Sequence, residues 1–584
     1  MTWTIRNCFP FSLTTHILST SRLPFFTEYP QRFYDTRPEL PHEMILELLS
    51  SLSRTTVLLL AGLSIILYII SQRIKASTSL PLPPGPPADS IWGNSFDAAF
   101  CYRRFELWTQ EYGPVFSLRQ GIPGFGGTRT IIIGRHRAAI EIMEKHGADI
   151  SDRPNSVAAG DTLSGGMRIL LIKSGDKFKK LRKALQSHLQ PKSIASYHPI
   201  LTQSARQHMF DIIEEHNATS KGTSSFVSTR HQDHARRYAA AVVMALAYGK
   251  VPHSYEDPEV QAVNRCLTRL GTFPLQEVRE KLARREEIPA SFGKYLIETQ
   301  PMLGLSDDET AYLAGSMFGA GSDTSASAIS VALMAATCYP EAQRVIQDEL
   351  DSVIGRGRPP TFSDQDSLPQ TMAFVHESFR WRPVTSGGFP HRATKDVIWQ
   401  GYLIPKGSTV IGNVWSIGRD PDLFPDPEKF DHTRWIATNE KGQVKLRDDL
   451  KSYPFGFGRR VCPGQHMATA STFLNLALVL WAFNLTSDVK NPIDTYAFTE
   501  SANAHPMPFN IVFTPRVSVK QGDREEKGWD ILKEALTLED KESQISARTG
   551  NRYGTVIFAS FMSHALGTAM VLIMRKQHVD MMES

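Results

Sequence analysis

The chain has 584 residues, of which 41% are hydrophobic and 21% are charged, values typical of a folded globular protein rather than a disordered one. Its 64 basic and 60 acidic side chains leave a net charge of +4, which gives no support to nucleic-acid binding. The five cysteines are scattered and form no Cys-x-x-Cys pair, which argues against a disulfide scaffold and against structural zinc.

An apolar segment precedes the bulk of the chain. Residues 1–53 show no clear periodicity, whereas within 54–74 the seventeen residues from Thr55 to Ser71 carry no charge and are rich in leucine and isoleucine. This stretch is slightly shorter than a bilayer core, but its flanks extend it, so we predict a transmembrane anchor over 54–74 rather than a buried core helix. Arg73 and Lys75 favour a cytosolic C-terminal side. Residues 75–90 are rich in proline and predict a stiff, extended hinge.

Short strands and helices are expected after the hinge. Two β-like runs, Val115 to Leu118 and Thr130 to Ile133, flank a glycine-rich stretch, which predicts a hairpin. The basic run from Lys177 to Lys183 is typical of a solvated helix face. Residues 199–249 predict further helices.

A long helix is predicted after Gly304. Ser306 supplies an N-cap, and the two aspartates that follow it form an acidic first turn. The helix then passes through Ala320, Gly321, Asp323 and Thr324, where the glycine lowers helix propensity relative to alanine. These residues are either a polar seam of an amphipathic helix or a place where a small molecule approaches the backbone.

The most distinctive stretch runs from Phe455 to Gly464, with a single cysteine, Cys462, among glycines and just after two arginines. Glycines allow tight turns and close approach of a flat partner. Arginine neighbours favour thiolate over thiol, and such a thiolate can be the axial ligand of a haem iron. The alternative is a lone buried cysteine in a glycine-rich turn. The whole pattern, Phe-x-x-Gly-x-Arg-x-Cys-x-Gly, favours the haem ligand.

This loop resembles the signature of the cytochrome P-450 family, and the resemblance runs from about Pro81 to about Pro515. It implies a mainly α fold with small β-sheets (α+β) over a catalytic domain at 91–515, after the N-terminal transmembrane anchor. It also implies heme b, iron protoporphyrin IX, with Cys462 as the iron ligand. The cofactor-binding residues implied are Cys462, Arg182, His391, Arg460, Phe455 and Gly458.

The resemblance also implies roles for residues elsewhere in the domain. Thr324 would hydrogen-bond dioxygen in a local widening of the helix, and Asp323 would help deliver protons through water. A buried network would fix the segment leading to the cysteine loop, and it comprises Glu377, Arg380 and Arg434. The substrate pocket would be lined by Ala320, Thr385, Ser386, Phe389 and Ser501.

The function implied is a membrane-anchored monooxygenase of the endoplasmic reticulum with a cytosolic catalytic domain. Its electrons would come from NADPH through a separate NADPH-cytochrome P-450 reductase, because no flavin or nicotinamide domain is evident. The substrate would be a hydrophobic small molecule: a terpenoid or other natural product of secondary metabolism, a steroid, a polycyclic aromatic or another xenobiotic. Two alternatives are a peroxide-rearranging haem-thiolate enzyme, against which the Asp323-Thr324 pair speaks, and a catalytically impaired haem-binding relic.

Three segments depart from the family pattern. Near 273–275 the chain lacks a longer apolar segment that lines the substrate channel in the family, so either the channel roof is abbreviated or an exon is missing. Residues 1–53 precede the anchor, and Met44 lies just upstream of it, which makes a gene-prediction artefact one explanation of this extension. Residues 516–584 extend past the usual end. Their mostly apolar stretch 555–574 is a second membrane segment, an interfacial helix or a translated intron.

Overall fold

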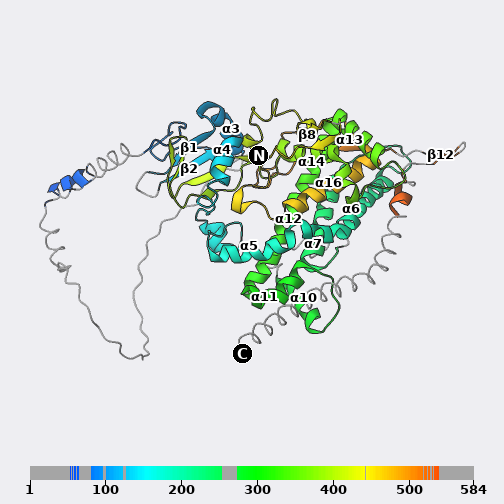
Figure 1. Ribbon diagram of the computed structural model, residues 1–584, viewed down its shortest axis with the longest axis horizontal. Helices are drawn as coiled ribbons and strands as arrows, with labels where there is room; N and C mark the ends of the chain where they lie inside the picture. The colour runs from blue at the N-terminus through cyan, green and yellow to red at the C-terminus, as the bar shows by residue number, and fades with distance from the viewer. Residues whose placement is uncertain are drawn as a thin grey trace, which may run out of the picture. The chain divides into compact units, whose positions relative to one another are not determined.

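The computed structural model describes residues 80–96, 100–122, 127–252, 272–440 and 442–516, with isolated positions between 53 and 67 and between 519 and 537. Helices dominate, and the strands form small separate sheets, so the predicted mainly helical α+β class is confirmed (Figure 1). The chain divides into two units, Met1–Ser79 and Leu80–Ser584, and the second carries every residue predicted for the site.

A four-stranded sheet joins the start of the catalytic domain to a segment at 391–412. Its strands, in spatial order, are β1 (Val115–Gln120), β2 (Thr128–Ile133), β7 (Thr409–Gly412) and β4 (His391–Arg392). Strands β1 and β2 are antiparallel, with Val115 opposite Ile133, which confirms the predicted pair of strands. The tip of their turn, 123–126, lies outside the described residues. Since β4 pairs with β7, the sheet places His391 close to the N-terminal hairpin.

The remaining strands form smaller sheets. Strands β10 (Phe483–Ser487), β11 (Ile511–Pro515) and β3 (Phe226–Ser228) make a three-stranded antiparallel sheet. Three two-stranded sheets pair β5 (Val397–Trp399) with β6 (Tyr402–Ile404), β8 (Ile436–Thr438) with β9 (Val444–Leu446), and β12 (Val519–Gln521) with β13 (Arg524–Glu526).

The helices account for most of the described chain. The α-helices are α3 (Cys101–Tyr112), α4 (His136–Ala139), α5 (Asp176–Leu189), α6 (Pro191–Thr219), α7 (His231–Tyr248), α10 (Thr272–Ala283), α11 (Phe292–Leu303), α12 (Asp307–Cys338), α13 (Pro340–Val353), α14 (Pro369–Trp381), α15 (Val414–Ile417) and α16 (Gln465–Ala482). Short π-helical turns are η1 (Ile140–Glu144) and η2 (Val157–Thr162), and 3-10 turns are η3 (Phe362–Ser367), η4 (His432–Trp435) and η5 (Gly458–Arg460). Helices α6 and α7 confirm the helices predicted over 199–249, with β3 between them.

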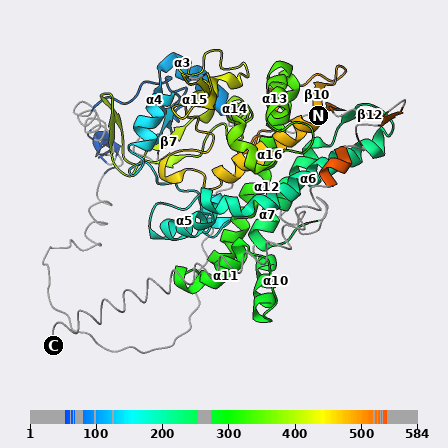
Figure 2. The same cartoon turned by 45° about the vertical axis from the view of Figure 1, so that its right-hand side comes forward.

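Helix α12 is the central element of the helical part. In Figure 2 it lies between α7 and α16, and it packs on both. Ser306 caps it as predicted: the Ser306 hydroxyl accepts from the Glu309 amide at 3.1 Å, and the Glu309 carboxylate accepts from the Ser306 amide at 3.1 Å. Every residue from Ser325 to Thr337 is buried, as expected for a helix packed on all sides. The neighbouring helices thus pack around its C-terminal half.

The largest apolar core surrounds the C-terminal half of α12. Side chains of α6, α7, α12, α14 and α16 form one contiguous cluster, in which Trp381, Trp481, Phe374 and Phe473 are among the fully buried members. Burying an aromatic side chain of this size removes a large apolar area from water. The core therefore holds α14, which carries Glu377, in a fixed relation to α16, which begins just after the cysteine loop.

The transmembrane prediction lies mostly outside the described residues. Within the part of the chain that is described, no helix combines the length and the apolar character needed to cross a bilayer. The described positions within 54–74 are helical, and their five leucines, 58, 59, 60, 63 and 67, are at least half exposed. The apolar stretch 555–574 falls outside the described residues. Both membrane segments stay predictions.

Two histidines are fully buried between the helices and the small sheet. The Nδ1 atom of His208 lies 2.7 Å from the side-chain oxygen of Asn475, and the Nε2 atom of His231 lies 2.9 Å from the carbonyl oxygen of Phe509. Burial lowers the pKa of His208 to about 3 and that of His231 to about 4. Both side chains are therefore neutral at pH 7.

Lowering the pH from 7 to 5 is expected to destabilise the fold through these two histidines. Because their folded pKa values lie below 6.5, their contribution is present above pH 6.5 and is lost as the pH falls toward about 4 and about 3. Each should cost up to about 2 kcal/mol at pH 5. Denaturant unfolding at the two pH values, with His208→Asn beside the native chain, measures this loss. An undiminished loss in the variant would contradict the assignment to His208.

Candidate active site

Cys462 lies in a tight loop that precedes α16. The Cys462 amide donates to the Phe455 carbonyl at 2.8 Å, which closes the loop on itself. Gly458 has φ +48°, and a Cβ atom there would lie 3.0 Å from the carbonyl oxygen of Met143. A residue with a side chain would be strained at this position and would press on η1. Phe455 and Gly458, which the sequence assigned to cofactor binding, thus shape the loop that presents the cysteine.

The two phenylalanines of the loop fasten it on opposite sides. The Phe457 ring stacks on Tyr453 at a centroid distance of 4.8 Å and fills the space beside Gly412, where a Cβ would lie only 2.4 Å from the ring. The Phe455 ring meets Phe379 of α14 edge-on at 5.4 Å. The loop is therefore held between the four-stranded sheet and α14.

The Cys462 thiol does not gain its reactivity from its sequence neighbours. Burial raises the pKa of Cys462, and the amide of Gly464 and the guanidinium of Arg182 lower it by less. Arg460 points elsewhere: its guanidinium donates to the carbonyls of Ser151 and Ile172. The expectation that the adjacent arginines favour the thiolate is not met: the one guanidinium that lowers the pKa of Cys462 belongs to Arg182 of α5. A metal ion bound to sulfur would itself favour the deprotonated form.

The predicted cofactor-binding side chains Arg182, Arg460 and His391 come from three parts of the chain. Arg182 of α5 donates to the carbonyl of Val461 at 2.5 Å. Arg460 stacks on the Phe178 ring of the same helix, with its guanidinium carbon 3.6 Å from the ring centroid. His391 of β4 is buried, and its pKa is lowered to about 3 by burial and by the nearby guanidiniums. The structure therefore brings Cys462, Arg182, Arg460 and His391 together.

A third guanidinium, that of Arg153, belongs to the same cluster and was missed by the sequence reasoning. It is only 4% exposed, and it donates to the carbonyls of Leu170 at 2.9 Å and Pro390 at 2.5 Å. Burial, together with the charge of Arg460, lowers its pKa to about 9. The one signal in the sequence was an arginine directly before a proline at the start of a loop of small residues.

The charge balance of this cluster tests whether heme b fits. The cluster contains three guanidiniums, those of Arg153, Arg182 and Arg460, which interact electrostatically with one another or with Cys462. Among the described residues, Asp152 carries the one carboxylate that interacts electrostatically with them. Arg182 Nε and Arg460 Nη1 are buried and have no hydrogen-bond partner. The excess of two positive charges equals the charge of the two propionates of heme b, and guanidiniums bind carboxylates well. The residues therefore fit the cofactor.

One face of α12 borders open space near its middle. Ala320 and Asp323 are exposed although the helix lies between α7 and α16. The Thr324 hydroxyl donates to the Ala320 carbonyl at 2.7 Å within the helix. The helix is α-helical throughout, so the local widening implied by the resemblance is not present. Close packing explains why residue 321 is a glycine, because a Cβ atom there would lie 2.9 Å from Cγ2 of Val243 on α7.

Gly321→Ala is expected to destabilise the protein through this contact. Overpacking a core costs about 1–3 kcal/mol, and the better helix propensity of alanine returns about 1 kcal/mol, so a net loss of about 1 kcal/mol follows. In a Val243→Ala background the same substitution should be neutral or stabilising. Denaturant unfolding of the four proteins measures both effects, and an equal cost in both backgrounds would exclude the packing explanation.

The predicted catalytic acid is held by the loop that contains Ser501. One oxygen of Asp323 lies 2.8 Å from Nε2 of His505, and the other accepts from the Asn503 amide nitrogen at 3.0 Å. Burial raises the pKa of Asp323, but the His505 and Asn503 contacts outweigh it, and the net pKa is lowered. Neither His505 nor Asn503 was predicted, because nothing in the sequence links them to a residue 180 positions earlier.

The three residues predicted to form a buried network are in contact. The Glu377 carboxylate accepts two hydrogen bonds from Arg380, at 2.7 and 2.8 Å, and lies 3.6 Å from Arg434 Nε. It also accepts from the Asp431 amide at 3.0 Å and from the indole of Trp435 at 2.9 Å, a donor that the sequence reasoning missed. The Glu377 and Arg380 side chains are 0% exposed. One carboxylate thus ties α14 to the segment around η4.

The predicted pocket-lining residues make hydrogen bonds to other residues of the chain. The Ser386 hydroxyl is buried and donates to the Pro383 carbonyl at 2.8 Å, so it is occupied. Ser501 bonds within its own turn, to the Asn503 carbonyl. The Phe389 carbonyl accepts from Arg153. Among Ala320, Thr385, Ser386, Phe389 and Ser501, no hydrogen bond joins any two members within the described residues.

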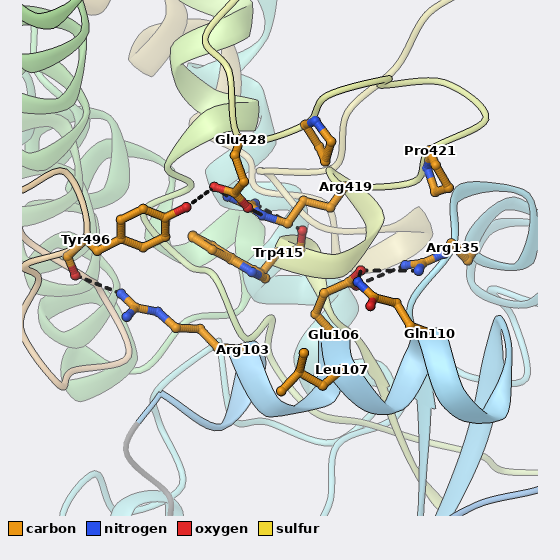
Figure 3. Close-up of a pocket in the computed structure, with 11 residues that line it drawn as sticks. Arg103, Glu106, Leu107, Gln110, Arg135, Trp415, Arg419, Pro421, Glu428 and Tyr496 are labelled. Carbon is orange, nitrogen blue, oxygen red and sulfur yellow. Dashed lines mark hydrogen bonds and ion pairs between the residues drawn. The ribbon is translucent and has the colours of Figure 1, made fainter.

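A separate pocket of about 490 Å³ opens between α3 and the segment after α15 (Figure 3). Arg103, Trp415 and Tyr496 are among its lining residues. Glu428 pairs there with Arg419, and despite its burial this pairing lowers its pKa to about 2. None of the predicted site residues lines this pocket. Its two carboxylates, of Glu106 and Glu428, pair with Arg135 and Arg419.

Comparison with known proteins agrees with this geometry. The profile of the family "Cytochrome P-450" matches residues 83–273 and 262–513. Cytochrome P-450 monooxygenase 88 of Postia placenta is 48% identical, over 79% of this chain and 96% of the relative. Monooxygenase 64 of the same fungus is 47% identical over the same shares, and a cytochrome P-450 monooxygenase of Armillaria gallica is 32% identical over 78% of this chain and 95% of the relative.

The alignments also bear on the family assignment and on chain length. The alignment with monooxygenase 88 spans 501 positions but 79% of the 584 residues here, about 461, so about 40 positions of that relative have no counterpart in this chain. The two profile matches overlap at residues 262–273. Together the matches cover well over half of the chain. The chain therefore belongs to the cytochrome P-450 family of monooxygenases, whose members bind haem through a cysteine thiolate.

Proposed function

We propose that this monooxygenase hydroxylates a hydrophobic small molecule, with electrons that a separate reductase takes from NADPH. One observation carries the site assignment: Cys462 lies among three guanidiniums whose excess charge and unpaired N–H groups match the two propionates of haem. When bound, haem supplies the activation of dioxygen and the oxidation of an unactivated C–H bond. This chain supplies the ligand, the proton path and the binding pocket.

Each residue of the cluster has a defined task in this proposal. Cys462 binds the iron, and Arg153, Arg182, Arg460 and His391 hold the propionates. The two N–H groups that are buried without partners, on Arg182 and Arg460, would then be satisfied. Arg182 belongs to α5 and Arg460 to the cysteine loop itself, so a propionate bound by both would also tie α5 to the loop.

Asp323 and Thr324 would move protons on the exposed face of α12. The Asp323 side chain is 49% exposed, so water reaches it, and its lowered pKa keeps it ionised at neutral pH, so that it would accept hydrogen bonds from water and orient it as a proton carrier. Thr324 follows directly and carries a hydroxyl that can pass a proton on. Its hydroxyl now donates to Ala320, and it must turn away from this carbonyl to donate elsewhere.

The exposed lysines of α5 would form the docking surface of the reductase. Lys177 and Lys183 are exposed on the helix whose Arg182 touches the cysteine loop, whereas Lys179 beside them pairs with Asp176 at 3.0 Å. A cluster of one sign steers an oppositely charged partner and does so less at high salt. An acidic surface on the reductase is the complement.

Charge reversal on α5 tests this surface. Lys177→Glu with Lys183→Glu should lower the rate of electron transfer from the reductase about tenfold or more at low salt, and the deficit should shrink as salt is added. Lys490→Glu, on an exposed loop after β10, is the matched control and should behave as the native chain does. Stopped-flow reduction of the haem under carbon monoxide reports the rate. Equal deficits at low and high salt would count against electrostatic docking.

We place the protein on the endoplasmic reticulum membrane, with the catalytic domain in the cytosol. The uncharged stretch within 54–74, the exposed leucines of its described positions and the proline-rich hinge after it support this arrangement. The substrate would be a terpenoid, a steroid, a polycyclic aromatic or a related xenobiotic. A segment missing near 273–275 would leave a shortened roof over the substrate channel.

Reconstitution tests the proposed reaction. The purified full-length chain is combined with a fungal NADPH-cytochrome P-450 reductase and screened against terpenoids, steroids and polycyclic aromatics. The expected result is a hydroxylated product whose formation requires both NADPH and oxygen. Turnover of a peroxide without NADPH or reductase would favour the peroxide-rearranging alternative instead.

A further inference from the structure

The turn formed by residues 499–507 is fixed to three other parts of the domain. The Ser327 hydroxyl of α12 donates to the Ala504 carbonyl at 2.7 Å. The Ala504 amide donates to the Val384 carbonyl at 2.7 Å, just after α14. From α7, the Gln232 side chain donates to the Pro506 carbonyl at 3.1 Å. These three hydrogen bonds place the turn beside α12.

From this position the turn also holds the acid of α12. Asp323 lies one helical turn before Ser327, so one face of the helix makes both contacts. His505 Nε2 lies 2.8 Å from one Asp323 oxygen, and Asn503 donates to the other at 3.0 Å. The His505 backbone is itself fixed, because its amide donates to the Thr499 hydroxyl at 3.0 Å. Both oxygens of the acid are thus engaged by a single turn.

The charged groups around the acid leave His505 as its main partner. Arg236 of α7 also acts on Asp323, but it already pairs with Asp233 at 2.8 Å. The His505 side chain is mostly buried, whereas Asp323 is half exposed. A partly buried histidine beside a carboxylate orients it more firmly than a solvated charge does. Loss of His505 would leave the carboxylate with one neutral amide on its other oxygen.

We propose that His505 is a positioning residue that orients the Asp323 carboxylate and thereby couples proton delivery to the turn at 499–507. This inference rests on the proposed function, because it assumes that Asp323 delivers protons. A shift of the turn, such as a bound molecule pressing on it would cause, moves His505 and changes where the carboxylate points. Proton delivery is then efficient only when the turn is in place.

The experiment compares His505→Gln, Asp323→Asn and the double variant with the native holoenzyme. Hydrogen exchange of the backbone amides of 499–507 reports, without any turnover, whether the contact between His505 and Asp323 holds the turn in place. Product formed per NADPH oxidised reports proton delivery, because misdirected protons release peroxide. His198→Gln is the matched control, since His198 stacks on Phe362 and makes no ion pair among the described residues. All proteins are first checked for equal haem content.

If the inference is right, His505→Gln and Asp323→Asn each speed exchange at 499–507. Each also lowers product per NADPH about three- to tenfold, and the double variant is no worse than Asp323→Asn alone. Native exchange and native coupling in His505→Gln, with loss of coupling in Asp323→Asn, would overturn the role of His505 and leave the proposed function intact. Native coupling in Asp323→Asn would overturn the proton role of Asp323 and this inference with it. If the double variant lost product per NADPH by the product of the two single losses, His505 would act independently of Asp323, and the inference would also be overturned.

Discussion

Replacing Glu377 by glutamine is expected to lower the free energy of unfolding by about 3–5 kcal/mol, because it strands buried positive charge. Arg380 gives two hydrogen bonds to this carboxylate, and neither side chain is exposed. Arg434 lies 3.6 Å from the same carboxylate, and its Nε is already without a hydrogen-bond partner. Glutamine has nearly the same shape but no charge, so the loss measures the charge itself.

The same substitution should reduce haem content as well as stability. Trp435 and the Asp431 amide also donate to Glu377, so the carboxylate fixes the segment that leads toward the cysteine loop. We expect the purified variant to hold less than half the haem of the native chain. Asp348→Asn is the control, since its pair with Arg344 is exposed and worth little. A Glu377→Gln protein with native haem content and stability would show that the network is dispensable.

Replacing Cys462 by serine is expected to abolish monooxygenase activity, with a loss of at least about a hundredfold. The loop should still form, because the hydrogen bonds that close it are between backbone atoms of Cys462, Phe455 and their neighbours. Serine therefore removes the thiolate while it keeps the geometry. Product formation with the reductase and NADPH is the measurement.

A second cysteine provides the control for this substitution. Cys338 is at the end of α12, and burial raises its pKa to about 11, so it stays a thiol. Cys338→Ser should keep haem and most of the activity. If Cys462→Ser retained activity comparable to that of Cys338→Ser, another residue would have to be the iron ligand.

Much of the fold followed from local sequence patterns. The paired strands around 115–133 and the Ser306 cap rest on residues close together in the chain, where short-range geometry decides the outcome. Glu377 and Arg380 are three apart on a helix, so their contact is also local. The roles given to distant residues such as His391 came from a resemblance, and the structure has brought that histidine to the cysteine loop.

Contacts between distant segments could not be predicted in this way. Arg153 and His505 carry no motif that names their partners, and their roles depend on how the chain folds back. The sequence left the stretch around Gly321 either as a polar seam or as a place where a small molecule approaches, and it did not show that Val243 of another helix packs against this glycine. The pKa of Cys462 depends on burial rather than on adjacent arginines. Each of these features follows from packing, which the order of residues alone does not show.

The central claim is that the Cys462 sulfur binds the haem iron. The most direct measurement is the difference spectrum of the reduced native protein with and without carbon monoxide. Thiolate ligation predicts a strongly red-shifted Soret band in the native chain, which disappears in Cys462→Ser. A native protein that binds haem but shows the unshifted band of imidazole ligation, or a shifted band that survives in Cys462→Ser, would contradict the account.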